Sequence, residues 1–109
     1  MNPTAETTKP QLVREEYGGE MYEYYPLGEY VVVAPGVCGG RPTFKYTRLE
    51  VSVILSMVGQ GTSIQEILRQ YAKSRINEAA IKEAIHLANH AFTEVTRPLW
   101  ESPHALQPA

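Results

Sequence analysis

A run of glycine, proline and basic residues in the middle of the chain, followed directly by an apolar segment, limits the fold most strongly. The run reads Gly39-Gly40-Arg41-Pro42-Thr43-Phe44-Lys45-Tyr46-Thr47-Arg48. Paired glycines permit a backbone with positive φ, and proline fixes φ and removes a donor, so the run predicts a tight loop. Nothing in the run supplies a nucleophile, a general base or a set of metal ligands. Its cations instead indicate contact with phosphate or with an acidic partner.

Three segments after this loop have helical periodicity, and we expect helices at about 49–58, 63–71 and 77–92. The first is apolar on nearly all faces, which predicts that it lies at the centre of the fold. Glycines at 59 and 61 end it. Ser63 and Glu66 form a capping box for the second helix, and Asn77 is the expected N-cap of the third.

A segment rich in tyrosine and valine precedes the loop and predicts a β-hairpin over residues 20–34. Its strands are expected at about 20–25 and 29–34, with Pro26-Leu27-Gly28 in the turn. An isolated hairpin is only marginally stable in water. It therefore needs a partner, which is either the helical body or the same hairpin of a second subunit. For a homodimer, the expected contact residues are Tyr22, Tyr24, Tyr30 and Val32.

Neither end of the chain shows a periodic pattern. Residues 1–16 are polar and predict a flexible arm, and residues 96–109 contain three prolines and predict an irregular tail. One domain over residues 17–95 suits a chain of 109 residues. The single Cys38 excludes an internal disulfide and fits a reducing compartment, and no apolar run is long enough to span a membrane. We therefore expect a cytoplasmic protein without a membrane partner.

The formal charge of −2 is distributed unevenly along the chain. Residues 1–30 and 76–109 carry more acids than bases, whereas residues 31–75 carry more bases than acids. A basic middle favours a polyanion or an acidic protein as the partner. The residues expected to bind nucleic acid or a partner are Arg41, Lys45, Arg48, Arg75, Asn77 and Lys82. The alternative is a solvated loop in which Arg48 binds carbonyl groups near the first helix.

Other chemical signals in the chain are weak. His86 and His90 have the spacing of a zinc protease motif, but Leu87 stands where that motif needs its glutamate. The glycines at 36–40 lack the Gly-Lys-Ser/Thr ending of a phosphate loop. Cys38 is either a reactive thiol or a structural cysteine, and the tyrosines either stack on bases or pack a sheet. We expect no catalytic residue, no metal and no cofactor, and hence a protein that is not an enzyme.

The segment from Gly39 to Phe92 resembles the domain-of-unknown-function family 433. The matching positions are Gly40-Arg41-Pro42, Thr47-Arg48, Val51, Gly61, Ser63, Glu66-Ile67-Leu68, Tyr71, Ile81, Ala84 and Ala88. The chain departs from the family pattern at Tyr46, where glycine usually precedes Thr-Arg, and at Ala72, where proline is frequent. The resemblance implies a similarity to VapB-type antitoxins and a homeodomain-like bundle that is often dimeric.

Together these features predict a mainly α fold, a homeodomain-like three-helix bundle of the helix-turn-helix type with an N-terminal β-hairpin. The expected function is that of a non-enzymatic antitoxin-like regulator that binds DNA weakly, a toxin protein, or both. In such a bundle the third helix would enter the major groove, although Glu78 and Glu83 on that helix oppose contact with DNA. The alternative is a structural protein-interaction module that forms a homodimer and binds no nucleic acid.

Overall fold

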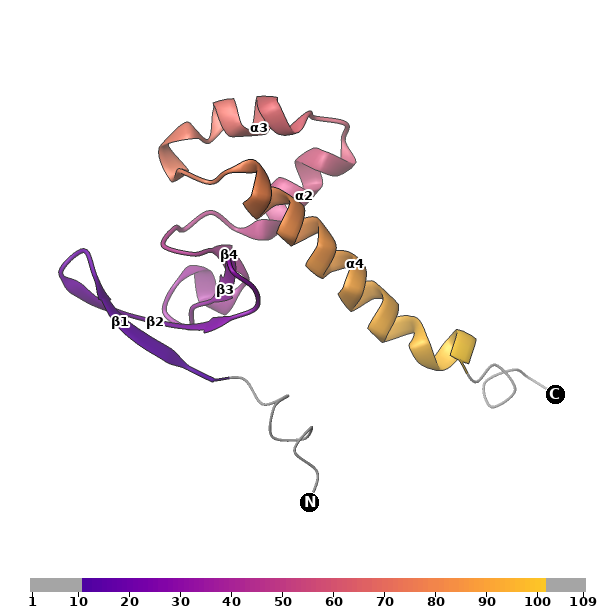
Figure 1. The fold of residues 1–109 in the computed structure, drawn as a ribbon, viewed down its shortest axis with the longest axis horizontal. Coiled ribbons are helices and arrows are strands. Elements are labelled where there is room, and N and C mark those ends of the chain that lie inside the picture. The colour runs from indigo at the N-terminus through magenta and orange to yellow at the C-terminus, as the bar shows by residue number, and fades with distance from the viewer. Residues whose placement is uncertain (1–10, 102–109) are drawn as a thin grey trace, which may run out of the picture.

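The computed structural model describes residues 11–101 and shows a sheet followed by helices (Figure 1). The strands are β1 (Val13–Tyr17), β2 (Glu20–Pro26), β3 (Val31–Val33) and β4 (Thr43–Phe44). The helices are α2 (Val51–Gly59), α3 (Ile64–Gln70) and α4 (Glu78–Glu101), with 3-10 turns η1 (Cys38–Gly40) and η2 (Ala72–Ser74). The sheet is antiparallel in the order β1-β2-β3-β4.

The expected mainly α fold is wrong, because a four-stranded antiparallel sheet precedes the three helices. The hairpin expected over 20–34 is present as β2 and β3, with Tyr25 opposite Val33. Two more strands flank it. β1 comes from residues expected in the flexible arm, and β4 lies inside the glycine- and proline-containing run. The helices therefore pack against a sheet and do not form the expected homeodomain-like bundle.

The ends of the chain also differ from the expectation. Residues 13–16 belong to β1 rather than to an arm, and residues 1–10 lie outside the described part. α4 begins near the expected residue but continues to Glu101, so residues 96–101 of the expected tail are helical. Pro98 lies in the final turn, where its missing N–H removes a single bond close to the helix end. The rest of the tail, 102–109, is also outside the described residues.

The core has two parts, one on each face of the sheet. On one face, the sheet packs against all three helices through buried side chains of Val31, Phe44, Val51, Ile54, Ile67, Ala80, Ile81 and Ala84. The other face buries Tyr24, Val32 and Ala34. Successive strand residues point to opposite faces, so Val31 and Val32 enter different parts of the core. α2 contributes Val51 and Ile54 to this core, with Ile54 fully buried, but Val53 on another face is 40% exposed, so the helix is not covered on nearly all faces as expected.

A carboxylate on α4 holds the turn between β2 and β3. The Glu83 side chain accepts hydrogen bonds from the backbone N–H groups of Glu29, Tyr30 and Val31, at 2.9, 2.8 and 2.9 Å. Gly28 leaves room for this contact, since a Cβ there would lie 2.5 Å from Glu83 Oε2. Glu83, expected to face a polyanion, thus joins the helix to the sheet.

The two halves of α4 have different surroundings. The first half is buried against the body through Ala80, Ile81 and Ala84. The second half extends away from the sheet and the other helices (Figure 1).

No helix within residues 11–101 combines the length and the apolar character needed to cross a membrane.

Candidate functional site

A cavity of about 610 Å³ lies where the end of β1, the loop after β4 and the connection between α3 and α4 meet. We call it the basic cavity. Its lining residues are Tyr17, Lys45, Tyr46, Thr47, Arg48, Lys73, Ser74 and Arg75. None of these lining residues is acidic. The cavity therefore combines four cationic side chains with two tyrosines, a threonine and a serine.

Within residues 11–101, the four cations of the basic cavity differ from the other basic residues in having no acidic partner. Ion pairs within residues 11–101 join five other cations to glutamates, and these five are Arg14, Arg41, Arg69, Lys82 and Arg97. No such pair within the same range involves Lys45, Arg48, Lys73 or Arg75. Uncompensated charges of one sign along a concave surface concentrate the electric field there. The basic cavity is thus suited to an anion.

Contacts of both the backbone and the side chain hold Lys45 in position. Its N–H donates to the Tyr30 carbonyl at 2.7 Å. Its Nζ lies 5.0 Å from the ring centroids of both Tyr24 and Tyr46. Interaction with the Tyr24 hydroxyl, and then with that of Tyr46, raises the pKa of Lys45. The ammonium group is therefore kept charged at the edge of the cavity.

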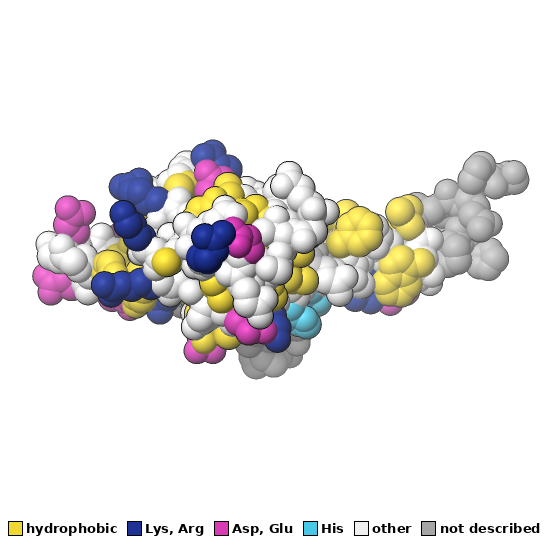
Figure 2. Space-filling view, turned by 90° about the horizontal axis from the view of Figure 1, so that it is seen from above, with side chains coloured by type: hydrophobic (Ala, Val, Ile, Leu, Met, Phe, Trp, Pro, Cys, Tyr) yellow, Lys and Arg dark blue, Asp and Glu magenta, His cyan; other side chains and the backbone are white. Residues whose placement is uncertain are grey.

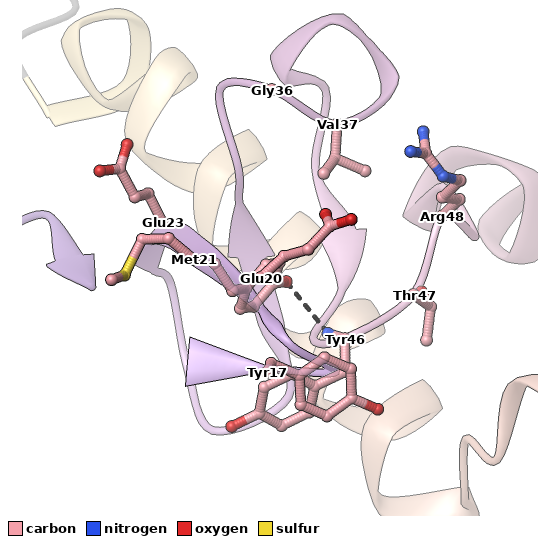
Figure 3. A pocket seen from close by; sticks show the side chains of 10 residues that line it. Tyr17, Glu20, Met21, Glu23, Gly36, Val37, Tyr46, Thr47 and Arg48 are labelled. Atoms are coloured by element: carbon pink, nitrogen blue, oxygen red, sulfur yellow. Dashed lines mark hydrogen bonds between the residues drawn. The ribbon is translucent and has the colours of Figure 1, made fainter. Parts of the chain in front are cut away.

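Tyr46 has an unusual backbone and a firmly held side chain. Its φ is 67°, in the left-handed region that favours glycine. Its ring stacks on Tyr17, with centroids 4.3 Å apart and an interplanar angle of 16° (Figure 3). Its N–H donates to the Tyr22 hydroxyl at 3.0 Å, and its hydroxyl donates to the Glu15 carboxylate, which raises the pKa of Tyr46. The chain thus keeps a glycine-like turn and adds an aromatic ring to it.

The neighbouring loop residues are also fixed by hydrogen bonds. Thr47 Oγ1 donates to the Phe44 carbonyl at 2.7 Å and accepts from the Leu49 N–H at 3.0 Å. On the opposite side of the cavity, Arg75 has a φ of 59° at the end of η2. Left-handed conformations of this kind occur often at functional sites, where the surrounding structure holds them. Two of them line the basic cavity, one on each loop.

Of the six residues predicted to bind nucleic acid or a partner, Lys45, Arg48 and Arg75 meet in the basic cavity. Asn77 lines an adjoining cavity of about 350 Å³ together with Lys45 and Arg75. Its side-chain oxygen accepts from the Ala80 N–H at 2.8 Å, which confirms the predicted N-cap of α4. Asn77 is thus close to the site but already has a structural role.

Arg41 and Lys82 do not line the basic cavity. Arg41 donates two hydrogen bonds to the Glu50 carboxylate, at 2.9 and 3.1 Å, and these bonds raise the pKa of Arg41 and lower that of Glu50. Lys82 pairs with Glu78, one turn earlier on α4, at 2.8 Å. Both cations are neutralised by neighbours on the protein itself.

Five residues of the cavity were not among the predicted site residues, namely Tyr17, Tyr46, Thr47, Lys73 and Ser74. Tyr46 and Thr47 stand inside the glycine-, proline- and cation-containing run that the sequence pointed to. Lys73 was detectable, because it stands two positions before Arg75 in a Lys-Ser-Arg run at the end of a predicted helix. Tyr17 gave no usable signal, because its place in the cavity depends on the pairing of β1 with β2. That pairing puts Tyr17 opposite Glu20 beside the loop that carries Tyr46.

The residues predicted to form a homodimer contact already pack against other residues of the same chain. Tyr24 and Val32 are buried in the second part of the core. Tyr22 and Tyr30 are half-buried, and Tyr22 packs against Tyr24 with ring centroids 4.9 Å apart. β1 and β4 pair with the edges of this hairpin, which was expected to be covered either by the helical body or by the same hairpin of a second subunit. Dimerisation through this hairpin stays a prediction.

The residues considered for chemistry lie apart from one another. Cys38 donates from Sγ to the Arg48 carbonyl at 3.2 Å. His86 and His90 lie on the exposed surface of α4. Within residues 11–101, no three His, Cys, Asp or Glu side chains are grouped in a way that could hold a metal ion.

Residues 31–88, more than half of the chain, match a family described as "Protein of unknown function (DUF433)". No curated protein and no solved structure matches the chain. The matched segment contains every residue of the basic cavity except Tyr17. β1, β2 and the outer half of α4 lie outside it.

Proposed function

We propose, from the premise that the chain belongs to the DUF433 family of proteins of unknown function, that it is a non-enzymatic protein that binds the phosphate backbone of a nucleic acid in the basic cavity. One observation carries this proposal. The four cations that have no acidic partner within residues 11–101 all line the same cavity, and no lining residue is acidic.

The overall charge of the protein does not oppose this function. The formal charge of −2 is the sum over the whole chain, whereas a bound phosphate responds mainly to charges within a Debye length, about 8 Å at physiological ionic strength. The cavity is lined by four positive side chains, and the Glu15 carboxylate bonded to Tyr46 offsets part of this charge. A nucleic acid is the common polyanion whose charges are spaced closely enough to engage several of them together.

The tyrosines add a second element of recognition. Tyr17 and Tyr46 form a stacked pair at the wall of the cavity, and Tyr17 is 52% exposed and Tyr46 40% exposed. An exposed aromatic ring beside cations is a surface on which an unpaired base can stack. The arrangement supports binding to single strands at least as well as to duplexes.

The same geometry supports a role without catalysis. The hydroxyl of Thr47 is bonded to the Phe44 carbonyl, and that of Tyr46 to the Glu15 carboxylate. No histidine, cysteine or carboxylate is among the residues that line the cavity. These groups are the most usual acids, bases and nucleophiles of enzymes, although lysine, tyrosine and hydroxyl side chains serve as well. The toxin partner of an antitoxin-like regulator stays a prediction from the resemblance.

Binding of labelled single-stranded and duplex oligonucleotides at 50 and 200 mM salt tests the proposal. The cavity variant replaces Lys45, Arg48, Lys73 and Arg75 with Gln. We expect it to bind at least 10-fold more weakly at low salt and to show a smaller salt dependence, since each lost phosphate contact removes about 0.7–0.9 from the logarithmic slope.

The matched control replaces Arg14, Arg41, Arg69 and Lys82 with Gln and so removes the same number of charges elsewhere. Circular dichroism checks that both variants are folded. Equal losses in the two variants would show that binding follows net charge and not the cavity. Absence of binding by the unaltered protein at low salt would overturn the proposed function.

A further inference from the structure

α4 carries a row of apolar side chains with coiled-coil spacing, which becomes exposed toward the end of the helix. Ile85, Ala88, Phe92, Val95 and Leu99 follow one another at intervals of three, four, three and four residues. Alternating intervals of three and four give the seam that two helices bury between them in a coiled coil. We call these five residues the α4 seam.

The α4 seam begins in the core and ends in solvent. Ile81, one interval earlier, is fully buried against the body. Farther along, Phe92 is 70% exposed, Val95 77% and Leu99 61%. Figure 2 shows hydrophobic side chains along the part of the molecule that extends toward the C-terminal end. The chain itself therefore covers only the first part of this apolar face.

The residues beside the seam point to a second copy of the same helix as the partner. The flanking positions hold Asn89, Ala91, Thr96 and Pro98, which carry no charge. Arg97 is already paired with Glu94 and Glu101 on its own helix. Two copies therefore meet without like-charge repulsion, and the face offers no free charge that would select a strongly charged partner.

The body of the protein determines the direction of the second helix. Toward the N-terminus of α4, the face that carries the seam is covered by the chain's own core through Ile81 and Ala84. A parallel partner would bring its own body against this covered region. The helix of an antiparallel partner ends before this covered region. The two bodies then lie at opposite ends of the helix pair.

We propose that the protein forms a homodimer in which the α4 seams of two copies pack as a short antiparallel coiled coil. With the twofold axis between Phe92 and Val95, Phe92 lies against Val95 of the partner subunit. Ala88 then lies against Leu99 of the partner subunit. Each layer combines a larger side chain with a smaller one, which is the complementarity that close packing requires. This dimer is independent of the basic cavity and differs from one formed through the hairpin.

Light scattering after size-exclusion chromatography, over a series of protein concentrations, tests the dimer. We expect the unaltered protein to approach twice its chain mass of 12.2 kDa as the concentration rises. The double variant Phe92→Glu/Val95→Glu should remain a monomer of 12.2 kDa, and it should stay folded because both side chains are exposed. A control variant, His86→Glu/His90→Glu, adds the same charge to other exposed positions of α4 and should still dimerise.

Three results would overturn the proposal. The first is a monomer at all concentrations, and the second is a dimer that persists in the Phe92→Glu/Val95→Glu variant. The third is a complex with a different protein that occupies the seam in place of a second copy. Small-angle X-ray scattering of the dimer should show two bodies at the ends of an extended particle, and a compact particle would contradict the antiparallel arrangement.

Discussion

Tyr46 has a left-handed backbone that glycine would adopt without strain. Its side chain nevertheless contacts three other residues. Its ring stacks on Tyr17, its hydroxyl binds Glu15, and Lys45 lies over the ring. A bulky residue at positive φ costs about 1–2 kcal/mol relative to its ordinary conformation. The contacts of the side chain offset that cost and at the same time form the aromatic wall of the cavity.

Substitutions at Tyr46 separate these two contributions. Tyr46→Ala keeps the strained backbone and loses the ring, whereas Tyr46→Gly loses the ring and removes the strain. We expect Tyr46→Ala to be less stable than Tyr46→Gly by about 1 kcal/mol. The free energies of unfolding from urea titration measure this difference.

Ser56, an exposed residue inside α2, provides the control position. In a helix interior alanine is more stable than glycine by about 0.5–1 kcal/mol, so the order at Ser56 should be reversed. The same order at both positions would show that the backbone of Tyr46 is not left-handed in solution.

Glu83 connects two elements that lie far apart in the sequence. It accepts three backbone hydrogen bonds from the β2–β3 turn, and the N–H of Val31 is on a buried residue. We expect Glu83→Ala to lower the free energy of unfolding by about 2 kcal/mol, because hydrogen bonds to a charged group are stronger than neutral ones and the donors lose their acceptor. Chemical denaturation measures the change.

Glu94→Ala is the matched control for this substitution, because Glu94 also lies on α4 but forms only a surface ion pair with Arg97. Its effect should be within about 0.5 kcal/mol, as is usual for exposed pairs. An equally small change in the free energy of unfolding for Glu83→Ala would contradict the prediction. It would mean that water accepts the hydrogen bonds of the turn in place of the carboxylate.

The elements differ in how well the sequence predicts them. The three helices were predicted within one or two residues at their starts, because periodicity and caps such as Ser63 are local signals. β4 has two residues and no periodic signal, and β1 has only one face that is partly covered. Both strands form because β2 and β3 present free edges, which is a tertiary condition that propensity does not contain.

The site was predictable in the same partial way. Local charge identified Lys45, Arg48 and Arg75, but charge alone did not separate them from Arg41 and Lys82. The difference lies in the glutamates that approach each cation after folding. Which basic residues remain without a partner is therefore a property of the folded chain.

The whole molecule should lose stability as the pH falls into the acid range. Hydrogen bonds from arginines lower the pKa of three carboxyl groups below the ordinary value of 4.5, namely those of Glu50, Glu66 and Glu94. A group with a lowered folded pKa stabilises the protein above its unfolded pKa, and this contribution is lost as the pH falls through the folded pKa. The melting temperature should therefore decrease as the pH falls below about 4.5.

Glu50→Gln should make this decrease shallower, since the Arg41 hydrogen bonds no longer depend on a titrating group. Glu16→Gln is the control, because Glu16 forms no ion pair within residues 11–101. Melting curves between pH 3 and pH 7 compare the three proteins. Identical slopes for the two variants would contradict a role of the Arg41–Glu50 pair in acid sensitivity.

The contact between Glu83 and the β2–β3 turn also has a consequence for the order in which the chain folds. The turn amides obtain their acceptor only after α4 has docked, more than 50 residues later in the chain. A hairpin that closed earlier would leave these three groups to water. The sheet and the last helix are therefore expected to belong to one cooperative unit, because opening the turn while α4 stays in place breaks all three of these bonds.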